Sequence, residues 1–272
     1  MNKEKKLIVA RRIAIVITQK CTLNCKLCCN SMPLFKKPIT VNTDEVISDI
    51  KNIFEKFDYV EWIQLVGGEI LLHKDLDLIV DEIYKYKEKF SKLILMTNGT
   101  LIPNVKLLNA LSKYSNRCDV QISDYGKWSY KLKENIELFN RYNIPHTVKM
   151  YHGDVQHYGG WFDNSSMEYR NYDTLTINHL FSCCTQIDLE NWHFYRGKLY
   201  SCIRSLFGKE LGVVVPNDDD FVNLRDECLS RDELYKKICL FKNRPPKACQ
   251  YCSGFDSKNG KRYPAAEQIV RA

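Results

Sequence analysis

Apolar residues along the first half of the chain follow two alternating patterns. Short runs of isoleucine, valine and leucine predict buried strands, and the segments between them carry apolar residues at helical spacing. The predicted strands are residues 13–18, 63–66, 93–96, 120–123 and 146–150. The predicted helices are residues 46–57 (capped by Asn42 or Thr43), 76–84, 104–114 and a segment through Ile136 and Phe139. This alternation predicts βα units around a parallel sheet, in a barrel or part of one.

A different pattern begins near Tyr151. Residues 151–171 are rich in Gly, His, Tyr and Asn without a clear period, which predicts a long active-site loop or a linker. Residues 189–195 and 198–203 flank Arg196 and Gly197 and predict a β-hairpin. The other expectations are a loop at 217–220, a helix at 231–241 and a loosely ordered polar segment from Gly254.

Composition and charge narrow the class of protein. The chain has 272 residues, of which 44% are hydrophobic, enough for a sizeable core. Its net charge of +7 is spread along predicted helix faces, as on an ordinary solvated surface; a basic cleft for a phosphorylated or nucleotide-linked substrate is the alternative. The sequence shows no nucleic-acid motif, membrane-length apolar run or signal peptide. We therefore expect a cytoplasmic protein that binds neither nucleic acid nor membrane.

The 12 cysteines are the most informative part of the composition. A disulfide framework is disfavoured, because the chain is too long to need one and shows no secretory signal. In a reducing compartment, clustered thiolates more often bind metal or perform redox chemistry. The spacing of the cysteines therefore becomes the main clue to function.

The first cysteine motif, CTLNCKLC, places Cys21, Cys25 and Cys28 directly after the first predicted strand. Three thiolates on one loop can hold three irons of a [4Fe–4S] cluster and leave the fourth iron open to a substrate. The alternative is a zinc site, which needs a fourth nearby ligand. Cys29 is available, but adjacent cysteines rarely bind the same metal.

Polar motifs follow the next three predicted strands. A glycine pair allows the backbone to approach a neighbour closely, and the carboxylate beside it can accept hydrogen bonds from an ammonium group. Parallel strands bring their carboxyl ends to one edge, so these motifs should meet the cysteine loop. The candidate cofactor-binding residues are Gly67, Gly68, Glu69, Thr97, Asn98, Ser123 and Asp124.

A second cysteine group lies in the last third of the chain and comprises Cys184, Cys202, Cys249 and Cys252. Four such thiols suit either a fully ligated [4Fe–4S] cluster or a zinc ribbon. Cys183 fits the loose spacing as well as Cys184, so the first ligand stays open. The thiol left over is a candidate hydrogen-atom donor, and His152, after the fifth strand, is a candidate catalytic residue.

Residues 11–150 resemble the radical S-adenosylmethionine (SAM) superfamily. The resemblance implies that Cys21, Cys25 and Cys28 bind the catalytic cluster and that the GGE segment binds the SAM amino group. It also implies that the ends of the third to fifth strands contact the ribose, carboxylate or adenine of SAM. Two positions depart from the usual pattern: Leu27 stands where an aromatic residue usually contacts adenine, and Ile70 stands where proline usually follows GGE.

The second cysteine group resembles the Twitch auxiliary-cluster domain. No cysteine follows Cys252, which favours one auxiliary cluster over two. The resemblance implies an α/β fold in which a partial (β/α) barrel, residues 1–165, precedes a small α+β Twitch domain, residues 166–272. Its implied cofactors are two [4Fe–4S] clusters and SAM.

The whole architecture is similar to that of radical SAM dehydrogenases and epimerases of aminoglycoside biosynthesis. It implies a 5′-deoxyadenosyl radical that abstracts hydrogen from a sugar or aminocyclitol, nucleotide-linked forms included, leading to epimerisation or dehydrogenation. Flavodoxin or ferredoxin would supply the electron. The alternatives are a maturase that modifies a ribosomally made peptide, and a non-catalytic iron–sulfur protein.

Overall fold

A computed structural model describes residues 6–164 and 166–269 of the chain. Its strands form one eight-stranded sheet in the order β5-β4-β3-β2-β1-β6-β7-β8. All pairs from β5 to β6 are parallel, and the β6–β7 and β7–β8 pairs are antiparallel. The strands are β1 (Val9–Thr18), β2 (Tyr59–Gly67), β3 (Phe90–Thr97), β4 (Cys118–Asp124), β5 (His146–Met150), β6 (Asn191–Tyr195), β7 (Lys198–Tyr200) and β8 (Phe221–Asn223).

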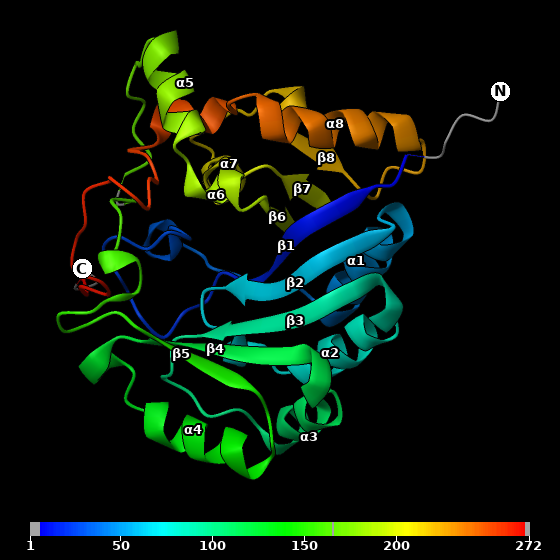
Figure 1. Cartoon of the computed structure of the whole chain (residues 1–272), viewed down its shortest axis with the longest axis vertical. Coiled ribbons are helices and arrows are strands. Elements are labelled where there is room, and N and C mark those ends of the chain that lie inside the picture. Colours follow the sequence, from blue (N-terminus) through cyan, green and yellow to red (C-terminus); the bar gives the residue numbers. More distant parts are fainter. Residues whose placement is uncertain (1–5, 165, 270–272) are drawn as a thin grey trace.

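Four helices connect the parallel strands and lie on the outer side of the curved sheet (Figure 1). They are α1 (Thr43–Lys56), α2 (Leu76–Tyr84), α3 (Val105–Lys113) and α4 (Leu132–Arg141). Their apolar faces pack on alternate strand residues such as Ile13, Ile15 and Ile17, which are at most 2% exposed. The next residues along each strand face the opposite, concave side. The helices thus bury one face of the sheet and leave the other for the site.

The predicted elements of the first half are all present. Every predicted strand forms, and β1 to β4 begin earlier than the apolar runs indicate because their first residues still pair with neighbours. Helix α1 is capped by Asn42, whose side chain accepts a hydrogen bond from the amide of Asp44 at 2.9 Å. Helix α3 is likewise capped by Asn104. Because hydrophobic periodicity and caps both act locally, they identify these elements well.

The second half contains more structure than its pattern predicts. The hairpin is correct, but β7 ends at Tyr200, and residues 203 onward turn into a helix. The helices are α5 (Thr174–Ser182), α6 (Thr185–Asp188), α7 (Ile203–Glu210) and α8 (Arg231–Asn243), and only α8 was expected. Strand β6 pairs in parallel with β1, so the hairpin extends the barrel sheet. The boundary between residues 165 and 166 stays a prediction.

The prediction of a loosely ordered C-terminal segment is wrong for its described part. Gln268 forms a β-bridge with Cys25, and Tyr263 forms one with Trp161. Ala266 is fully buried against Leu23 and Cys25. Polar residues here bond to the cysteine loop instead of to water, which composition alone does not reveal.

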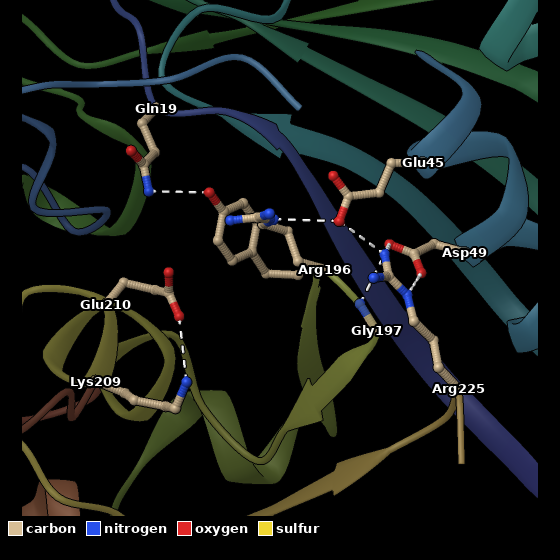
Figure 2. Close-up of polar contacts among 9 residues, drawn as sticks. Gln19, Glu45, Asp49, Arg196, Gly197, Lys209, Glu210 and Arg225 are labelled. Atoms are coloured by element: carbon tan, nitrogen blue, oxygen red, sulfur yellow. Dashed lines mark hydrogen bonds and ion pairs between the residues drawn. The ribbon is translucent and has the colours of Figure 1, made fainter. Parts of the chain in front are cut away.

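Charged residues of α1 tie the barrel to the β6–β8 region (Figure 2). Arg225 donates two hydrogen bonds to the buried Asp49, at 2.7 and 2.8 Å, and one to Glu45 at 2.9 Å. The amide of Gly197 donates to the same Asp49 carboxylate at 3.2 Å. On the far side of the hairpin, Gln19 donates to the Tyr195 hydroxyl at 3.1 Å. Since Gln19 precedes the cysteine loop, this network fixes the position at which the loop begins.

None of the helices among the described residues is both long and apolar enough to cross a membrane.

Candidate functional site

The cysteine loop begins where β1 ends and folds back over the carboxyl edge of the sheet. Cys25 is 7% exposed, and Cys21 and Cys28 are half-buried. Burial raises the pKa of the Cys25 thiol to about 11, and the pKa of Cys28 is raised by burial and by the charges of Cys29, Cys25 and Cys21. Thiolates packed in this way need a bound cation to offset their charge. A cluster iron would supply that charge, so the donor set fits. Leu27 is buried in the same loop.

The glycine pair after β2 packs against the backbone of this loop. The amides of Gly68 and Glu69 donate to the carbonyls of Thr18 and Lys20, at 2.9 and 2.8 Å. A Cβ on Gly68 would lie 2.1 Å from the Lys20 oxygen, and one on Gly67 would lie 2.2 Å from the Thr18 oxygen. Gly67 also has a φ of +149°, a conformation that other residues rarely adopt. The close approach that requires glycine here is therefore to the cysteine loop itself.

Glu69 is completely buried, and its carboxylate accepts three hydrogen bonds. It accepts hydrogen bonds from the Thr97 hydroxyl at 2.8 Å, the Asn98 amide at 2.8 Å and the Leu71 amide at 3.0 Å. Burial raises its pKa in spite of these donors. The sequence-based expectation was a carboxylate that receives the SAM ammonium group. In this geometry the side chain fastens the GGE turn to the turn after β3, and its contact with SAM stays a prediction.

The turn after β3 reaches the cysteine loop through side chains. Asn98 donates to Thr22 at 3.1 Å and to the Cys21 sulfur at 3.6 Å. Thr22 and Thr100 share a hydrogen bond of 2.6 Å, and Thr100 donates to the Asn98 amide oxygen at 2.7 Å. Three loops that are distant in sequence are thus held around Cys21. Thr22 and Thr100 carry no motif, so the sequence analysis did not select them.

The turn after β4 joins the same edge through Ser129. Its hydroxyl lies 2.7 Å from the Asn98 carbonyl and 3.0 Å from the Ser123 carbonyl, and it accepts from the Tyr125 amide. Beyond it, Asp124 pairs with His152, with 2.8 Å between the carboxylate and Nε2. Asp124 and His152 were predicted for separate roles, and the structure brings them together. Because a carboxylate can only accept a hydrogen bond, it favours the tautomer with the proton on Nε2. The other ring nitrogen, Nδ1, is then able to accept a proton.

The C-terminal segment covers the other side of the cysteine loop. Gln268 donates from Nε2 to the Cys25 sulfur at 3.1 Å, and its Oε1 accepts from the Asn24 amide at 2.7 Å. The amide of Ile269 donates to the Asn24 carbonyl at 2.9 Å. No local pattern marks Gln268, because its partners in the cysteine loop are more than 200 residues away. It is the nearest polar neighbour that the sequence analysis missed.

The second cysteine group lines one cavity. Cys184 directly precedes α6, and Cys202 directly precedes α7. Cys249 lies in the turn at Lys247–Tyr251, and Cys252 directly follows it. All four border this cavity. Burial raises the pKa of Cys184 to about 12, with added repulsion from Cys202 and Cys252. Cys183, by contrast, lies outside the lining, with its sulfur 3.9 Å from Nδ1 of His179.

A buried cation accompanies these four thiols. Arg204 is 5% exposed, lines the cavity and donates to the Tyr251 carbonyl at 2.7 Å. Burial lowers its pKa, and the nearby Cys252 and Cys202 act in the opposite direction. A positive charge beside four sulfurs suits a ligand set whose net charge is negative.

Across the described residues, no group of three or more His, Cys, Asp or Glu side chains is arranged to hold a single metal ion.

Comparison with known families agrees with the geometry at the carboxyl edge. Residues 15–124, which contain the cysteine loop and the three turns, match the Radical SAM superfamily. These residues form a radical SAM domain. The superfamily implies SAM and one [4Fe–4S] cluster as cofactors, so the sequence-based resemblance is confirmed for this part. The Twitch assignment and the auxiliary cluster are not tested by this match.

Two sets of relatives extend the comparison. A SAM-dependent nucleotide dehydratase of Selenomonas ruminantium is 33% identical over 100 residues, 37% of this chain and 34% of that protein. A GTP 3′,8-cyclase of Helicobacter pylori is 30% identical over 92 residues, 33% of this chain and 28% of that protein. The chain therefore aligns with only about a third of the length of these relatives.

Solved structures share the fold over nearly the whole chain. BtrN in complex with AdoMet and 2-DOIA superposes with a TM-score of 0.61 and 16% identity, covering 96% of this chain and 98% of BtrN. The enzyme anSMEcpe with bound AdoMet superposes with a TM-score of 0.51 and 14% identity, covering 95% and 89%. The predicted α/β class with a partial radical SAM barrel is confirmed.

Proposed function

We propose that the chain is a radical SAM enzyme that abstracts hydrogen from a sugar or aminocyclitol, leading to epimerisation or dehydrogenation. The observation that carries the proposal is the radical SAM domain, whose cysteine loop is bonded to the GGE turn and to the turn after β3. When bound, the reduced cluster and SAM supply a 5′-deoxyadenosyl radical. Every other step falls to the residues of the chain.

Cys21, Cys25 and Cys28 would hold the catalytic cluster, and the turns after β2 and β3 would hold SAM. Gly67, Gly68, Glu69, Thr97 and Asn98 would shape this site, and Glu69 joins the two turns by its bonds to Thr97 and Asn98. Ser123 and Leu27 would border the adenosine. These roles follow the family resemblance and the position of each residue at one edge of the sheet.

The Asp124–His152 pair is the proposed proton acceptor. The carboxylate lies 2.8 Å from Nε2 and would orient the ring so that Nδ1 can receive a proton from a substrate hydroxyl. Proton removal beside a carbon radical favours oxidation to a carbonyl, and the electron that this step releases would pass to the auxiliary cluster proposed for the second cysteine group. If oxidation does not occur, a thiol must return a hydrogen atom, and Cys183 is the proposed donor because it lies outside the cysteine cavity.

The class of substrate is proposed from the relatives. BtrN, whose fold spans almost the whole chain, was solved with AdoMet and 2-DOIA. The two curated relatives are named for nucleotide substrates. A sugar or aminocyclitol that is either free or nucleotide-linked agrees with both kinds of relative. Cys184, Cys202, Cys249 and Cys252 are proposed to hold an auxiliary [4Fe–4S] cluster, and flavodoxin or ferredoxin is the proposed reductant.

The test is an anaerobic assay of the reconstituted protein with reduced flavodoxin, SAM and a panel of nucleotide sugars, sugar phosphates and aminocyclitols. We expect 5′-deoxyadenosine and a ketone or epimer to form together with one class of compound. Deuterium from heavy water at one inverted carbon identifies epimerisation, and a ketone formed with one SAM per turnover identifies dehydrogenation. Turnover of a peptide alone would overturn the carbohydrate assignment. An absence of SAM cleavage in cluster-loaded protein would overturn the enzyme assignment.

A further inference from the structure

Two basic side chains face the concave side of the sheet and form no ion pair with any residue that the structure describes. Arg12 lies on β1, in register with Trp62, and Lys149 lies on β5, in register with Ser123. Their strand neighbours Ile13 and Val148 point toward the helix side, so both cations project into the concave face. Both are half-buried. Such positions usually carry apolar or paired residues.

The surroundings of Arg12 hold its guanidinium in place without neutralising it. Its central carbon lies 4.2 Å from the centre of the Trp62 ring, a cation–π contact. Its buried Nε has no hydrogen-bond partner in the part of the chain that the structure describes. Burial and the neighbouring Arg11 lower its pKa. A buried donor left unsatisfied costs free energy, which a ligand can recover.

Lys149 interacts with Arg12 as one positive charge with another. Burial and then Arg12 lower the Lys149 pKa, so the two cations lie close enough to repel. Within the described ranges, Lys149 forms no ion pair. Two carboxylates act on these cations without pairing with them: Glu61 raises the pKa of Arg12 and Asp119 raises that of Lys149. Both are also engaged elsewhere, since Asp119 accepts from Thr147 at 3.1 Å and lies 3.9 Å from Lys92, and Glu61 lies 4.0 Å from Arg11.

The loop after β5 connects this pair of cations to the reaction site. The His157 pKa is lowered by burial and by Lys149, and Tyr158 interacts with Arg12. The His157 ring meets Tyr151 edge-on at 5.5 Å. Tyr151 in turn contacts Tyr125 with the two rings tilted and their centres 5.4 Å apart. The cations therefore lie on the same side of the sheet as the residues that follow β4 and β5.

We propose that Arg12 and Lys149 bind a phosphoryl group of the substrate. The inference rests on the proposed function and adds that the sugar or aminocyclitol enters as a phosphate or diphosphate ester. Two close, partly desolvated cations are stabilised by a single dianion between them, and Arg offers a planar fork that matches phosphate oxygens. Trp62 keeps the fork oriented before the ligand arrives, which limits the entropy lost on binding.

The first test measures binding of inorganic pyrophosphate and of UDP to the cluster- and SAM-loaded protein by calorimetry in phosphate-free buffer. We expect both to bind, and Arg12→Gln or Lys149→Gln to weaken each by roughly ten- to a hundredfold. Arg12→Lys keeps the positive charge but loses the planar guanidinium. Its affinity for both anions should lie between that of the wild type and that of Arg12→Gln. Lys92→Gln is the matched control, because Lys92 lies on the same face but is near Asp119, and it should bind as the wild type does. Tighter binding of UDP than of pyrophosphate would indicate a nucleotide-linked substrate, and equal binding would indicate a simple phosphate ester.

Two outcomes separate this inference from the proposed function. Wild-type protein that cleaves SAM but binds neither pyrophosphate nor UDP overturns the phosphoryl site and leaves the radical SAM assignment intact. Protein that binds both anions but never produces 5′-deoxyadenosine overturns the proposed function alone. If Lys92→Gln weakens binding as strongly as Arg12→Gln, the effect is one of overall charge, and the site is also overturned. Iron content and circular dichroism of each variant check its folding.

Discussion

The carboxylate of Glu69 accepts the backbone amide of Asn98 at 2.8 Å, so one buried charge joins the turn after β2 to the turn after β3. Because the amide belongs to the residue that also reaches the Cys21 sulfur, the bond connects the GGE turn to the cysteine loop. The side chain is therefore expected to act on SAM binding indirectly, by positioning backbone groups.

We predict that Glu69→Gln lowers both the thermal unfolding midpoint and the affinity for SAM. The amide nitrogen of glutamine would face a backbone N–H or a hydroxyl, leaving a buried donor unsatisfied at a cost of about 1–3 kcal/mol. Thr97→Val, which removes one donor and keeps the carboxylate, should lose less, about 1 kcal/mol. Calorimetric SAM titration and thermal unfolding measure both effects. Lost SAM affinity at an unchanged midpoint would instead indicate direct contact between the carboxylate and SAM.

Gly68→Ala should reduce iron loading, because the new Cβ would meet the Lys20 carbonyl at 2.1 Å. The backbone of the cysteine loop would have to move, which displaces Cys21. Gly153→Ala is the matched control: a Cβ there meets nothing within 4 Å, and its positive φ of +72° adds backbone strain of about 1–2 kcal/mol far from the cysteine loop in sequence. Iron and sulfide analysis after anaerobic reconstitution decides the matter. Equal loading in the two variants would show that the loop tolerates the displacement.

The sequence predicts those parts of the site that depend on local patterns. The cysteine loop and the turns follow apolar strand runs, so parallel pairing brings them to one edge. Helix α5 was missed because none of its residues is buried, and it therefore has no apolar stripe. Helix α7 was missed because five consecutive residues, Arg204 to Gly208, are buried, which also hides the period. Gln268 and Arg204 were missed because their roles depend on contacts with distant segments.

Gln268→Glu should lower the reduction potential of the cluster bound by Cys25. The glutamate would still accept from the Asn24 amide, but it removes the donor at 3.1 Å from the sulfur and adds a negative charge. Hydrogen bonds to cluster sulfurs and net charge are main determinants of such potentials. A redox titration followed by electron paramagnetic resonance measures the shift. Glu267→Gln, which alters only the exposed pair with Lys26, should leave the potential unchanged; a shift of equal size there would assign the effect to surface charge.

Cys184 and Cys183 are adjacent, yet the structure assigns them different surroundings, and this difference gives the sharpest prediction for the second cysteine group. Cys184 lines the cavity with Cys202, Cys249 and Cys252, whereas Cys183 lies beside His179.

Two clusters would give about eight iron atoms per chain. Cys184→Ser should reduce the count toward about four, and Cys183→Ser should keep about eight, because only the first removes a proposed ligand. The second variant also tests the proposed hydrogen-atom donor: if the reaction is an epimerisation, it should stop product formation while 5′-deoxyadenosine still forms. Iron loss on Cys183→Ser but not on Cys184→Ser would reverse the two roles. Stoichiometric zinc in the anaerobically purified protein would show that the second cysteine group binds zinc and not an auxiliary cluster.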